Sequence, residues 1–446
     1  MKNILVLGAG RSSSALIQYL LKKSEENGWF VTVADTDIAA AEKKINAHQN
    51  GKAACLDVLN LDERHKQIKQ ADVVVSLLPA YLHLQVAHEC IKLKKHLVTA
   101  SFTSKEMYEL DDEAQKNGLI FMNELGLDPG IDHMSAMQKI DEIKAKGGNL
   151  TAFRSYTGGL VAPENDDNPW NYKFTWNPRN VILAGQGTAQ FLEDGKYKYI
   201  PYQRIFQQYR TIHVSEMGEY DGYANRDSLI YRKLYGISDI PNILRGTIRH
   251  KGFCNAWDAL VQLGLTDDSF TILDSENLTY SELLESYMGD KKWENGTLQE
   301  RVASLLNIKI DSEVMKKLEW LGLFEYTKIN LIKATPALIL EHLLLEKWKL
   351  TPHDKDMILM QHEFEYTLNG TKKLLTSTLI MKGENATDTA MSRLVGLPLG
   401  IFVRLVMQKN TLPKGVNIPV MKEVYEPILE ELAQFGVVFK EKDELI

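Results

Sequence analysis

Short β-rich apolar runs alternate with amphipathic stretches over about the first 130 residues of the chain. This alternation is typical of βαβ units and a parallel sheet. We expect six parallel strands, at residues 3–7, 29–34, 52–56, 72–77, 96–99 and 119–122. Two intervening stretches, 13–23 and 82–93, carry apolar residues at helical spacing and are predicted to be crossover helices. The pattern therefore predicts a doubly wound parallel sheet, or Rossmann domain.

The pattern changes after residue 123, where a Gly/Pro-rich segment at 126–130 precedes a helical stretch at 132–146. We place a domain hinge there. Later strand patterns predict a second, mixed sheet, with strands at 152–156, 213–216, 247–251, 356–368 and 372–380. The last two flank Asn369-Gly370, which favours a hairpin with a type I′ turn.

Helix-forming residues without strand alternation predict a mostly helical insertion around 264–348. Near the C-terminus, two helices at 387–407 and 421–435 and a closing strand at 437–440 are expected. The predicted fold class is α/β, with an N-terminal Rossmann domain and a mixed α/β substrate domain. The Rossmann domain comprises residues 1–128, with 390–446 returning to it, and the substrate domain comprises 129–389.

Length, charge and cysteine usage narrow the class of protein. A chain of 446 residues is too long for one core, which agrees with two domains. The net charge of -7 and the scattered Lys and Arg residues argue against a nucleic-acid partner. Three widely spaced cysteines favour a reducing, cytoplasmic location and show no metal-ligand spacing. Charges interrupt the apolar runs before spanning length, so we expect no membrane segment.

The segment GAGRSS at residues 8–13 follows the first strand and precedes a helix. Its two glycines match a dinucleotide-binding fingerprint, in which the first permits a tight turn and the second lets the backbone approach a pyrophosphate. Serine replaces the third glycine and is small enough for close helix packing. The alternative is a tight turn without a ligand, which rarely needs both glycines. The predicted cofactor residues here are Gly8, Gly10, Arg11, Ser12 and Ser13.

Asp35 ends the second strand, where an acidic side chain accepts hydrogen bonds from the adenosine ribose and repels a 2′-phosphate. It therefore favours NAD over NADP, although nearby Lys43, Lys44 and Arg11 keep NADP possible. The alternative is an exposed turn aspartate. Further cofactor contacts are predicted where later strands end, at Asp57, Leu78 and Ala100.

Several longer motifs resemble one known family over nearly the whole chain. They are VSLLP at 75–79, LVTAS at 97–101, NELGLDPGIDHM at 123–134, YTGGL at 156–160, DNP at 167–169, YKF at 172–174, NRDS at 225–228 and LRGTIR at 244–249. In these segments the chain resembles the glutamate-forming saccharopine dehydrogenases, also called saccharopine reductases. The dozen residues around Asp128 carry the resemblance most specifically.

The resemblance implies oxidation of the secondary amine of saccharopine by hydride transfer to a nicotinamide. Water then hydrolyses the imine to L-glutamate and 2-aminoadipate 6-semialdehyde, or the reaction runs in reverse, in lysine biosynthesis or degradation. It also implies two lobes with the substrate between them, and we expect a homodimer. Carried over from the family motifs, the substrate set is Ser101, Phe102, Asp128, Asn225, Arg226, Thr247, Ile248 and Arg249, with Arg245 less certain.

The substrate side also has a chemical argument of its own. Saccharopine carries three carboxylates, and forked, permanently charged guanidinium groups bind carboxylates well. Arg226 and Arg249 suit this role, whereas most single arginines are solvated surface residues.

Asp128 is the predicted catalytic residue, because a carboxylate after the sixth strand can orient the amine or accept its proton. The alternative is a helix cap before Pro129, with Asp132 as a competing cap. His133 is expected to be structural rather than catalytic.

Two positions depart from the family pattern, since Phe102 stands where Tyr is usual and Thr157 where Cys is frequent. Both usual residues can carry protons, so Asp128, an ordered water or a lysine such as Lys173 remains for that role. One rival function is therefore oxidation of another carboxylated secondary amine, an opine or a carboxynorspermidine-like compound. A second rival is a non-catalytic NAD-binding paralogue, against which the glycines, Asp35 and the arginine motifs argue.

Overall fold

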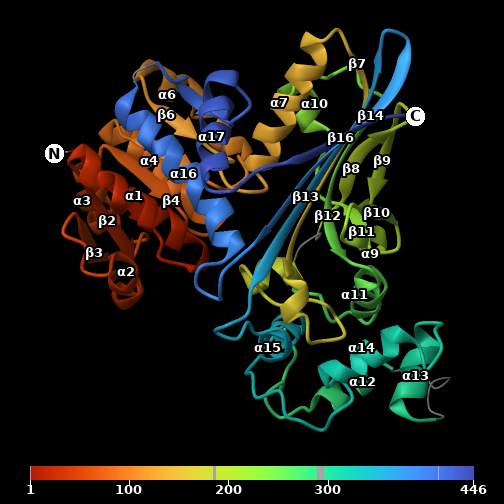
Figure 1. Cartoon of the computed structure of the whole chain (residues 1–446). Helices are drawn as coiled ribbons and strands as arrows, with labels where there is room; N and C mark the ends of the chain where they lie inside the picture. Colours follow the sequence, from red (N-terminus) through yellow and green to blue (C-terminus); the bar gives the residue numbers. More distant parts are fainter. Residues whose placement is uncertain (1, 184–186, 289–295, 410) are drawn as a thin grey trace. The chain divides into compact units, whose positions relative to one another are not determined.

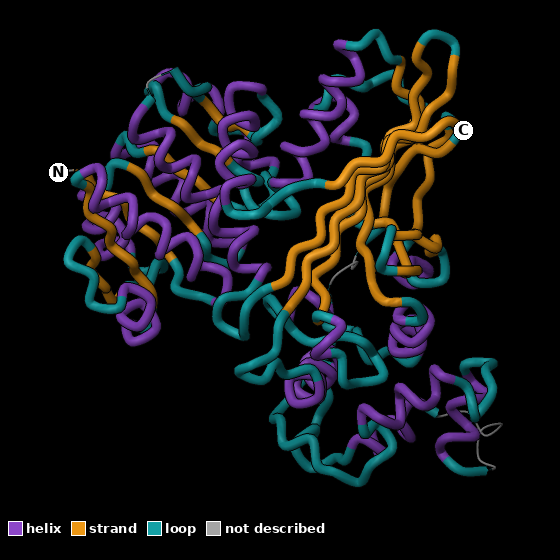
Figure 2. Tube along the Cα trace, viewed as in Figure 1, coloured by secondary structure: helices purple, strands orange, loops and turns teal. Residues whose placement is uncertain are grey.

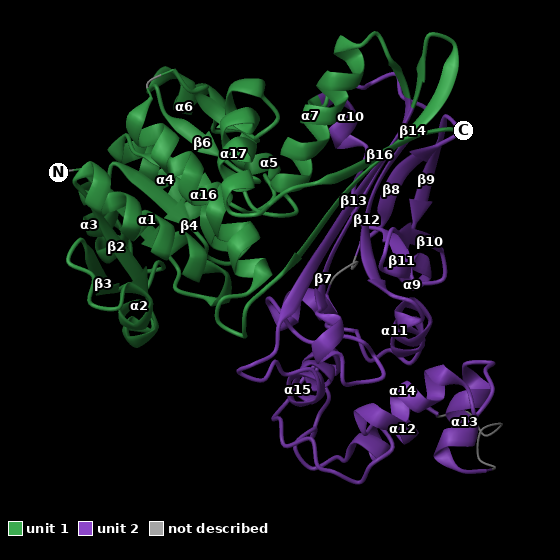
Figure 3. Ribbon diagram, in the orientation of Figure 1, with its two compact units in different colours: residues 1–150, 234–236, 366–446 green, residues 151–233, 237–365 purple. Residues whose placement is uncertain are grey.

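The computed structural model of the chain describes residues 2–183, 187–288, 296–409 and 411–446 (Figure 1). It divides into two compact units, coloured separately in Figure 3. Unit 1 contains residues 1–150, 234–236 and 366–446, and unit 2 contains residues 151–233 and 237–365.

Unit 1 is built on a seven-stranded sheet in which all neighbouring strands are parallel. The strand order is β15-β6-β5-β4-β1-β2-β3. The strands are β1 (Lys2–Leu7), β2 (Trp29–Asp35), β3 (Gly51–Cys55), β4 (Val73–Ser76), β5 (His96–Thr99), β6 (Ile120–Met122) and β15 (Gly415–Asn417). All six strands predicted for the first domain are therefore confirmed, while the short strand β15 was not predicted.

Helices connect and cover the strands of this sheet, as Figure 2 shows in purple. They are α1 (Ser14–Asn27), α2 (Ile38–Ile45), α3 (Leu61–Gln70), α4 (His83–Leu93), α5 (Lys105–Tyr108), α6 (Asp111–Lys116), α7 (Ile131–Ala145), α16 (Ala390–Gln408) and α17 (Lys422–Gln434), with one-turn 3-10 helices at Arg11–Ser13 and Ala80–Leu82. Local signals set several starts, because Asp37, Asn60 and Thr389 accept hydrogen bonds from backbone amides in the first turn.

The sheet of unit 1 is buried on both faces, as its continuous apolar strands predict. Leu5 and Leu7 belong to a core with Ile68 of α3 and Val86 of α4. Because side chains alternate along a strand, Ile4 and Val6 point to the opposite face, and they are also fully buried. The first strand therefore lies in the middle of the unit.

Helix α16 explains why one stretch near the C-terminus is so apolar. Among the described residues it is the helix long and apolar enough to span a membrane, but 83% of its most apolar window is buried. Its glycines allow close approach to α1: a Cβ atom at Gly396 would lie 2.6 Å from the backbone nitrogen of Leu16. The apolar character of α16 thus matches its position in the core of unit 1.

The division between the units differs from the predicted domain boundaries. Residues 390–446 lie in unit 1, but so do α7 and residues 366–389, which we had assigned to the second domain. Contacts account for this correction: Tyr425 of α17 donates to Asp141 of α7 at 2.6 Å, and Tyr366 donates to Asp443 at 3.0 Å. Lys144 of α7 also donates to the carbonyl of Gly236, in the short segment 234–236.

The predicted hairpin turn lies in unit 1, just after the boundary at residue 366. Strand β13 (Asp356–Leu368) ends and β14 (Thr371–Lys382) begins around Asn369 and Gly370, whose φ angles are 52° and 80°. Two positive φ angles are what a type I′ turn requires. The closing strand β16 (Lys440–Leu445) pairs antiparallel with β14, a few residues later than the predicted range of 437–440.

Unit 2 contains a mixed sheet, which confirms the predicted fold class. Strand β7 (Asn149–Val161) pairs parallel with β12 (Asn242–His250), while β11 (Gly218–Ala224) pairs antiparallel with both β12 and β10 (Tyr209–Val214). Beside β12 lies an unpredicted hairpin of β8 (Ala189–Glu193) and β9 (Lys196–Ile200). β13 follows β7 in the strand order.

Helices surround this sheet and form the insertion. They are α8 (Pro178–Ile182), α9 (Tyr202–Ile205), α10 (Ile230–Leu234), α11 (Phe253–Gln262), α12 (Tyr280–Tyr287), α13 (Leu298–Leu305), α14 (Glu313–Leu321) and α15 (Pro336–Lys347), with a 3-10 turn at Pro163–Asn165. The last four α-helices lie within the predicted helical insertion, 264–348. Two of them begin with a complete capping box, Thr279 with Glu282 and Thr297 with Glu300.

Candidate active site

The glycine loop between β1 and α1 has the geometry expected of a phosphate-binding turn. Gly8 has a φ of 105°, and a Cβ atom there would lie 3.1 Å from the carbonyl oxygen of Leu77. Gly10 is exposed, with no atom within 4 Å of the position a Cβ would take. A ligand can therefore approach the backbone at Gly10. Ser13 is buried and donates to the Gly10 carbonyl at 2.9 Å, so it fits the packed position of the third glycine.

Asp35 lies at the end of β2 and contacts the glycine loop directly. Its Oδ2 accepts from the amide of Ala9 at 2.6 Å, and its Oδ1 accepts from the amide of Asp37 at 2.9 Å. The carboxylate of Asp35 is therefore fixed beside the loop, while its bond from Asp37 is of the kind that a turn aspartate also forms. Its ribose contact stays a prediction.

Lys44, at the end of α2, brings a positive charge to the same loop. Its Nζ donates to the hydroxyls of Ser13 and Ser14 at 3.0 and 2.9 Å and to the carbonyl of Gly10. Burial lowers the pKa of Lys44 to about 8, although the charge of Asp35 opposes this shift. The loop thus carries a carboxylate and a partly buried amine, while Arg11 is exposed and Ser12 half-buried.

The other predicted cofactor residues lie at the carboxyl ends of neighbouring strands. Asp57 follows β3 and is exposed, Leu78 follows β4, and Ala100 follows β5. In a parallel sheet these ends share one edge, where open α/β proteins bind their ligands. The structure therefore brings these positions to the same edge of the sheet as the glycine loop.

Ser101 and Phe102 follow β5 at this edge, and both are half-buried. The Ser101 hydroxyl lies 2.7 Å from Nε2 of His83, whose Nδ1 lies 2.8 Å from the hydroxyl of Ser76. Burial lowers the pKa of His83 to about 4, so its imidazole is neutral at pH 7. Sequence reasoning missed His83 and Ser76, yet a histidine starting the helix after the fourth strand was a usable signal.

Asp128 lies in a loop between β6 and α7 that is unusually compact. A Cβ atom at Gly130, whose φ is 147°, would come within 2.1 Å of the carbonyl oxygen of Gly126. Helix α7 has Gly130 as its N-cap, and Asp132 accepts from the Gly130 amide at 2.6 Å. Asp128 is therefore not the helix cap. It is half-buried, and its substrate role stays a prediction.

His133 is buried inside a hydrogen-bond network within unit 1. Its Nε2 lies 2.9 Å from Oε2 of Glu124, and its Nδ1 lies 2.5 Å from the hydroxyl of Tyr235. Burial opposes ionisation of Glu124, but the bonds from His133 and the amide of Thr103 outweigh it and hold the pKa below its usual range. This arrangement agrees with a structural role for His133.

In unit 2, strand pairing brings the two arginine motifs together. Asn225 and Arg226 directly follow β11, and Tyr223 of that strand is opposite Thr247 of β12. The amide of Asn225 donates to the carbonyl of Arg245 at 2.9 Å. Arg226 itself is exposed.

Thr157, which stands where the family often has Cys, lies beside strand β12 as well. Thr157 of β7 is the parallel neighbour of Thr247, and its hydroxyl is buried without a hydrogen-bond partner among the described residues. The register therefore makes positions 157 and 247 direct neighbours, with Asn225 beside Arg245 of the same strand β12, which the sequence separation does not reveal.

Arg249 is the most informative residue of unit 2, because it is a buried cation. It is 3% exposed, and its guanidinium lies over the rings of Tyr172 and Phe253 at 5.1 and 5.6 Å. One Nη donates to the carbonyl of Ile248, but Nε has no partner and no described Asp or Glu forms an ion pair with it. Buried charges are normally paired, so Arg249 is suited to bind an anion.

Two other candidate residues, Lys173 and Arg245, already interact with side chains of the protein. The Nζ of Lys173 pairs with Asp167 at 2.8 Å and with Asp354 at 2.9 Å. Burial alone would lower the pKa of Lys173, but these carboxylates raise it, so this lysine is a poor proton acceptor. Arg245 stacks on the ring of Tyr231 at 4.3 Å. The described residues contain no cluster of three or more His, Cys, Asp or Glu side chains suited to a metal.

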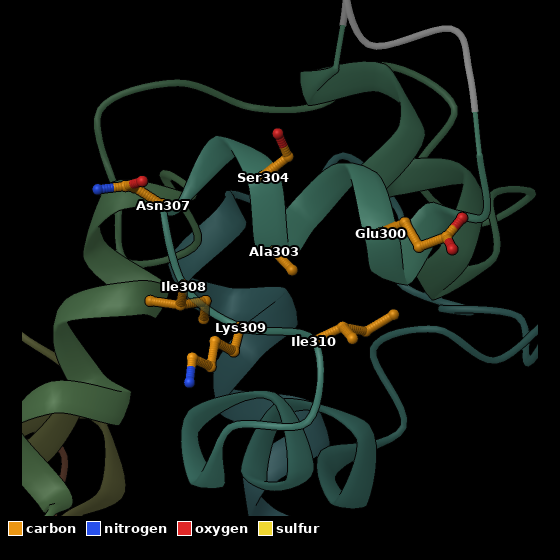
Figure 4. Close-up of a pocket in the computed structure, with 7 residues that line it drawn as sticks. All are labelled: Glu300, Ala303, Ser304, Asn307, Ile308, Lys309 and Ile310. Carbon is orange, nitrogen blue, oxygen red and sulfur yellow. The ribbon is translucent and has the colours of Figure 1, made fainter.

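A pocket of about 500 Å³ lies apart from all these residues, in the helical insertion (Figure 4). It is lined by Glu300, Ala303, Ser304, Asn307, Ile308, Lys309 and Ile310. Glu300 already accepts from the amide of Thr297 in the capping box of α13. This pocket offers no grouped acid, base or nucleophile.

Comparisons with known proteins cover the whole chain. Residues 4–122 match the saccharopine dehydrogenase NADP binding domain, and residues 126–437 match the saccharopine dehydrogenase C-terminal domain. Saccharopine dehydrogenase (NADP(+), L-glutamate-forming) of Saccharomyces cerevisiae is 34% identical over 99% of both chains. The mitochondrial alpha-aminoadipic semialdehyde synthase of Mus musculus is 33% identical over 98% of this chain and 47% of its own length.

A solved structure supports the same likeness. The apo saccharopine dehydrogenase (L-Glu forming) of Saccharomyces cerevisiae superimposes with a TM-score of 0.89 at 32% identity, covering 100% of both chains. The resemblance inferred from the motifs is therefore confirmed, and so is the two-part α/β fold.

Proposed function

Because the chain belongs to the saccharopine dehydrogenase family, we propose that it oxidises saccharopine to L-glutamate and 2-aminoadipate 6-semialdehyde, or catalyses the reverse reaction, in lysine metabolism. The chain is an oxidoreductase that acts on a CH–NH group with a nicotinamide dinucleotide. Both directions use the same site, because the imine is common to them.

The unpaired guanidinium of Arg249 is the observation that carries the choice of substrate. Arg249 is buried and forms no ion pair with an Asp or Glu in the described part of the chain, so a bound anion would balance its charge. Saccharopine supplies three carboxylates, and the planar guanidinium can bind one of them through two parallel hydrogen bonds. Arg226, which follows Asn225 beside β12, provides a second cation for another carboxylate.

The cofactor residues fit a dinucleotide on structural grounds. The positive φ of Gly8, which glycine adopts without strain, and the open space over Gly10 allow the pyrophosphate to approach the backbone. A nicotinamide bound there would supply the acceptor for the hydride that leaves the carbon which becomes the aldehyde. The residues of the chain then have three tasks: to hold the carboxylates, to remove the amine proton and to supply protons for imine hydrolysis.

Asp128 is our proposed proton carrier. The amine must lose a proton before its lone pair can assist hydride departure, and imine hydrolysis requires another proton transfer. Phe102 has no proton to exchange, the threonine hydroxyl of Thr157 is a weak acid, and Lys173 is held by two carboxylates. Asp128 is half-buried in the loop that follows β6, at the edge of the sheet where open α/β proteins bind their ligands, so its carboxylate suits the role.

A single assay tests the proposed function. Purified protein is mixed with saccharopine and NAD or NADP, and the reduced nicotinamide is followed by absorbance, with L-glutamate quantified as the product. Turnover is expected for the wild-type protein and should be lost in Arg249→Met, while cofactor binding is retained. A wild-type protein that binds cofactor but does not release L-glutamate from saccharopine contradicts the proposal.

One rival remains specific enough to test with the same assay. Phe102 and Thr157 replace the usual phenol and thiol, which favours a different carboxylated secondary amine, such as an opine or a carboxynorspermidine-like compound. A higher kcat/KM for one of these amines than for saccharopine would establish the rival.

We further propose that NAD is used better than NADP. The negative charge of Asp35 is held at the end of β2, where it would repel a 2′-phosphate. The opposing observations are Lys44 on the same loop and the relatives whose names include NADP(+). Measured kcat/KM values with both cofactors decide between them, and equal or better use of NADP overturns this preference.

We also propose that the protein is a cytoplasmic homodimer. Its three cysteines are free thiols, which suits a reducing compartment. Tyr197 and Tyr199 are more than half exposed on β9, where a second copy can cover them. Light scattering of the purified protein gives its mass in solution, and fractionation of cells gives its location.

A further inference from the structure

Three residues from consecutive elements of unit 1 form a hydrogen-bonded row. Ser76 ends β4, His83 begins α4, and Ser101 follows β5. The Ser76 hydroxyl lies 2.8 Å from His83 Nδ1, and the Ser101 hydroxyl lies 2.7 Å from His83 Nε2. Ser76 is 0% exposed and His83 4% exposed, so water does not compete for the bond between these two side chains. Of the three residues, Ser101 alone is half-buried and can reach a ligand.

The backbone of Ser101 is held as firmly as its side chain. Its amide donates to the hydroxyl of Thr99 at 3.3 Å, and its carbonyl accepts from the amide of Glu124 at 3.1 Å. Backbone contacts fix where the residue sits, but they leave the hydroxyl free to rotate about χ1. Contact with His83 is what selects one orientation.

A neutral imidazole has one N–H donor and one acceptor nitrogen, so the row has a direction. If Nε2 carries the hydrogen, it donates to the Ser101 oxygen, and Ser76 donates to Nδ1. The hydroxyl hydrogen of Ser101 then points away from His83 and is available to an acceptor. Burial lowers the pKa of His83 to about 4, so the imidazole is neutral at pH 7.

We propose that His83 is a positioning residue: it holds the Ser101 hydroxyl with its hydrogen directed at a carboxylate of the substrate, and Ser76 sets the required tautomer. This inference rests on the proposed function, since the carboxylate belongs to saccharopine. Unit 1 thereby gains a fixed neutral donor at the carboxyl edge of its sheet. His83 contacts no substrate atom itself.

Two conservative substitutions separate the two ends of the imidazole. In His83→Gln the side-chain amide occupies the place of Nε2 and can still donate to Ser101. In His83→Asn the amide occupies the place of Nδ1 and can still accept from Ser76, but it cannot reach Ser101. The experiment measures kcat, KM for saccharopine and the Kd of the cofactor for wild type, both variants, Ser101→Ala and the double variant Ser101→Ala/His83→Asn.

A lost hydrogen bond to a charged acceptor should raise KM on the order of tenfold. We expect this increase for Ser101→Ala and for His83→Asn, with the cofactor Kd unchanged. His83→Gln should stay within about threefold of wild type, and the double variant should be no worse than Ser101→Ala alone. Equal losses in His83→Asn and His83→Gln, or losses that multiply in the double variant, overturn the proposal.

Ser76→Ala provides an independent test if the His83 variants do not fold. It should raise KM for saccharopine about two- to threefold, as expected for a neutral hydrogen bond, and this increase should vanish in the Ser101→Ala background. The same increase in both backgrounds contradicts the proposal. A wild-type protein without saccharopine turnover would instead refute the proposed function, whereas an active wild type with independent losses refutes the role of His83 alone.

Discussion

The polar groups of the candidate site differ between the two units in whether they already have hydrogen-bond partners. In unit 1 these groups already have partners within the protein: Asp35 accepts two backbone amides, and His83 lies between two serines. In unit 2 the guanidinium of Arg249 and the hydroxyl of Thr157 are buried with unfilled hydrogen-bond positions. Satisfied groups stabilise the empty protein, whereas unfilled ones gain their partners from a ligand. Unit 1 is thus preorganised, whereas unit 2 keeps unfilled positions that the proposed substrate would occupy.

The largest expected effect follows replacement of Arg249 by Met, which has a similar length and no charge. Saccharopine binding should weaken by about 4 kcal/mol, near the upper end expected when a desolvated charge pair loses one partner. The melting temperature of the empty protein should not fall, because an unpaired buried charge is removed. Calorimetric titration and thermal unfolding measure the two quantities.

Arg226→Ala is the matched control, because Arg226 is exposed. It should weaken saccharopine binding by only about 2 kcal/mol. A drop in melting temperature for Arg249→Met that equals its loss of binding would break the contrast between the units, since Arg249 would then stabilise the empty protein.

In unit 1 we expect the free energy of unfolding to depend on pH, because His83 is buried as a neutral imidazole. The pKa of His83 falls from 6.5 to about 4 on folding because burial disfavours its charged form. Above pH 6.5 the imidazole is neutral in both states, and stability is lost as pH falls from 6.5 towards 4, where only the unfolded state gains the proton. The loss amounts to about 3 kcal/mol for this shift.

His83→Gln does not titrate, so its unfolding free energy should fall less over the same interval. Chemical denaturation of wild type and variant at pH 7 and pH 4.5 measures the difference. His96, whose pKa is also lowered to about 4 by burial, stays in both proteins and serves as an internal reference. Parallel pH profiles for the two proteins would show that His83 is not buried as a neutral base.

Turnover tests Asp128 without relying on binding. Asp128→Asn should lower kcat more than about tenfold, because a positioned general acid or base contributes at least that much. Phe102→Tyr should change kcat less than about tenfold. A wild type that gains substantial activity only with the tyrosine would show that the phenol is required and that this chain acts on another amine.

The smallest effect is expected for cofactor choice. Asp35→Ser removes the charge that repels a 2′-phosphate, so the ratio of kcat/KM for NAD to that for NADP should fall severalfold, on the order of 1 kcal/mol. Lys44→Met should shift the ratio in the opposite direction if its ammonium binds that phosphate. If the ratio is unchanged in Asp35→Ser, the Asp35 carboxylate acts only through its hydrogen bonds from the amides of Ala9 and Asp37.

Local patterns in the sequence determined most of the secondary structure of unit 1. The six predicted strands and the Asn369-Gly370 turn follow from short-range preferences, as do the glycine loop and the start of α7. The motifs also identified the family, while the roles of the arginines and of Asp128 stay predictions. These features depend on neighbouring residues, so a linear pattern suffices for them.

Tertiary structure decided which distant residues meet and which polar groups remain unfilled. Pairing of β7 with β12 places Thr157 beside Thr247, although 90 residues of sequence separate them. Helix α7 belongs to unit 1 because it packs against α17. Burial lowers the pKa of His83, and Arg249 is buried without an ion pair to a described Asp or Glu. Strand register and desolvation arise only when separate segments pack, so neither can be read from local sequence.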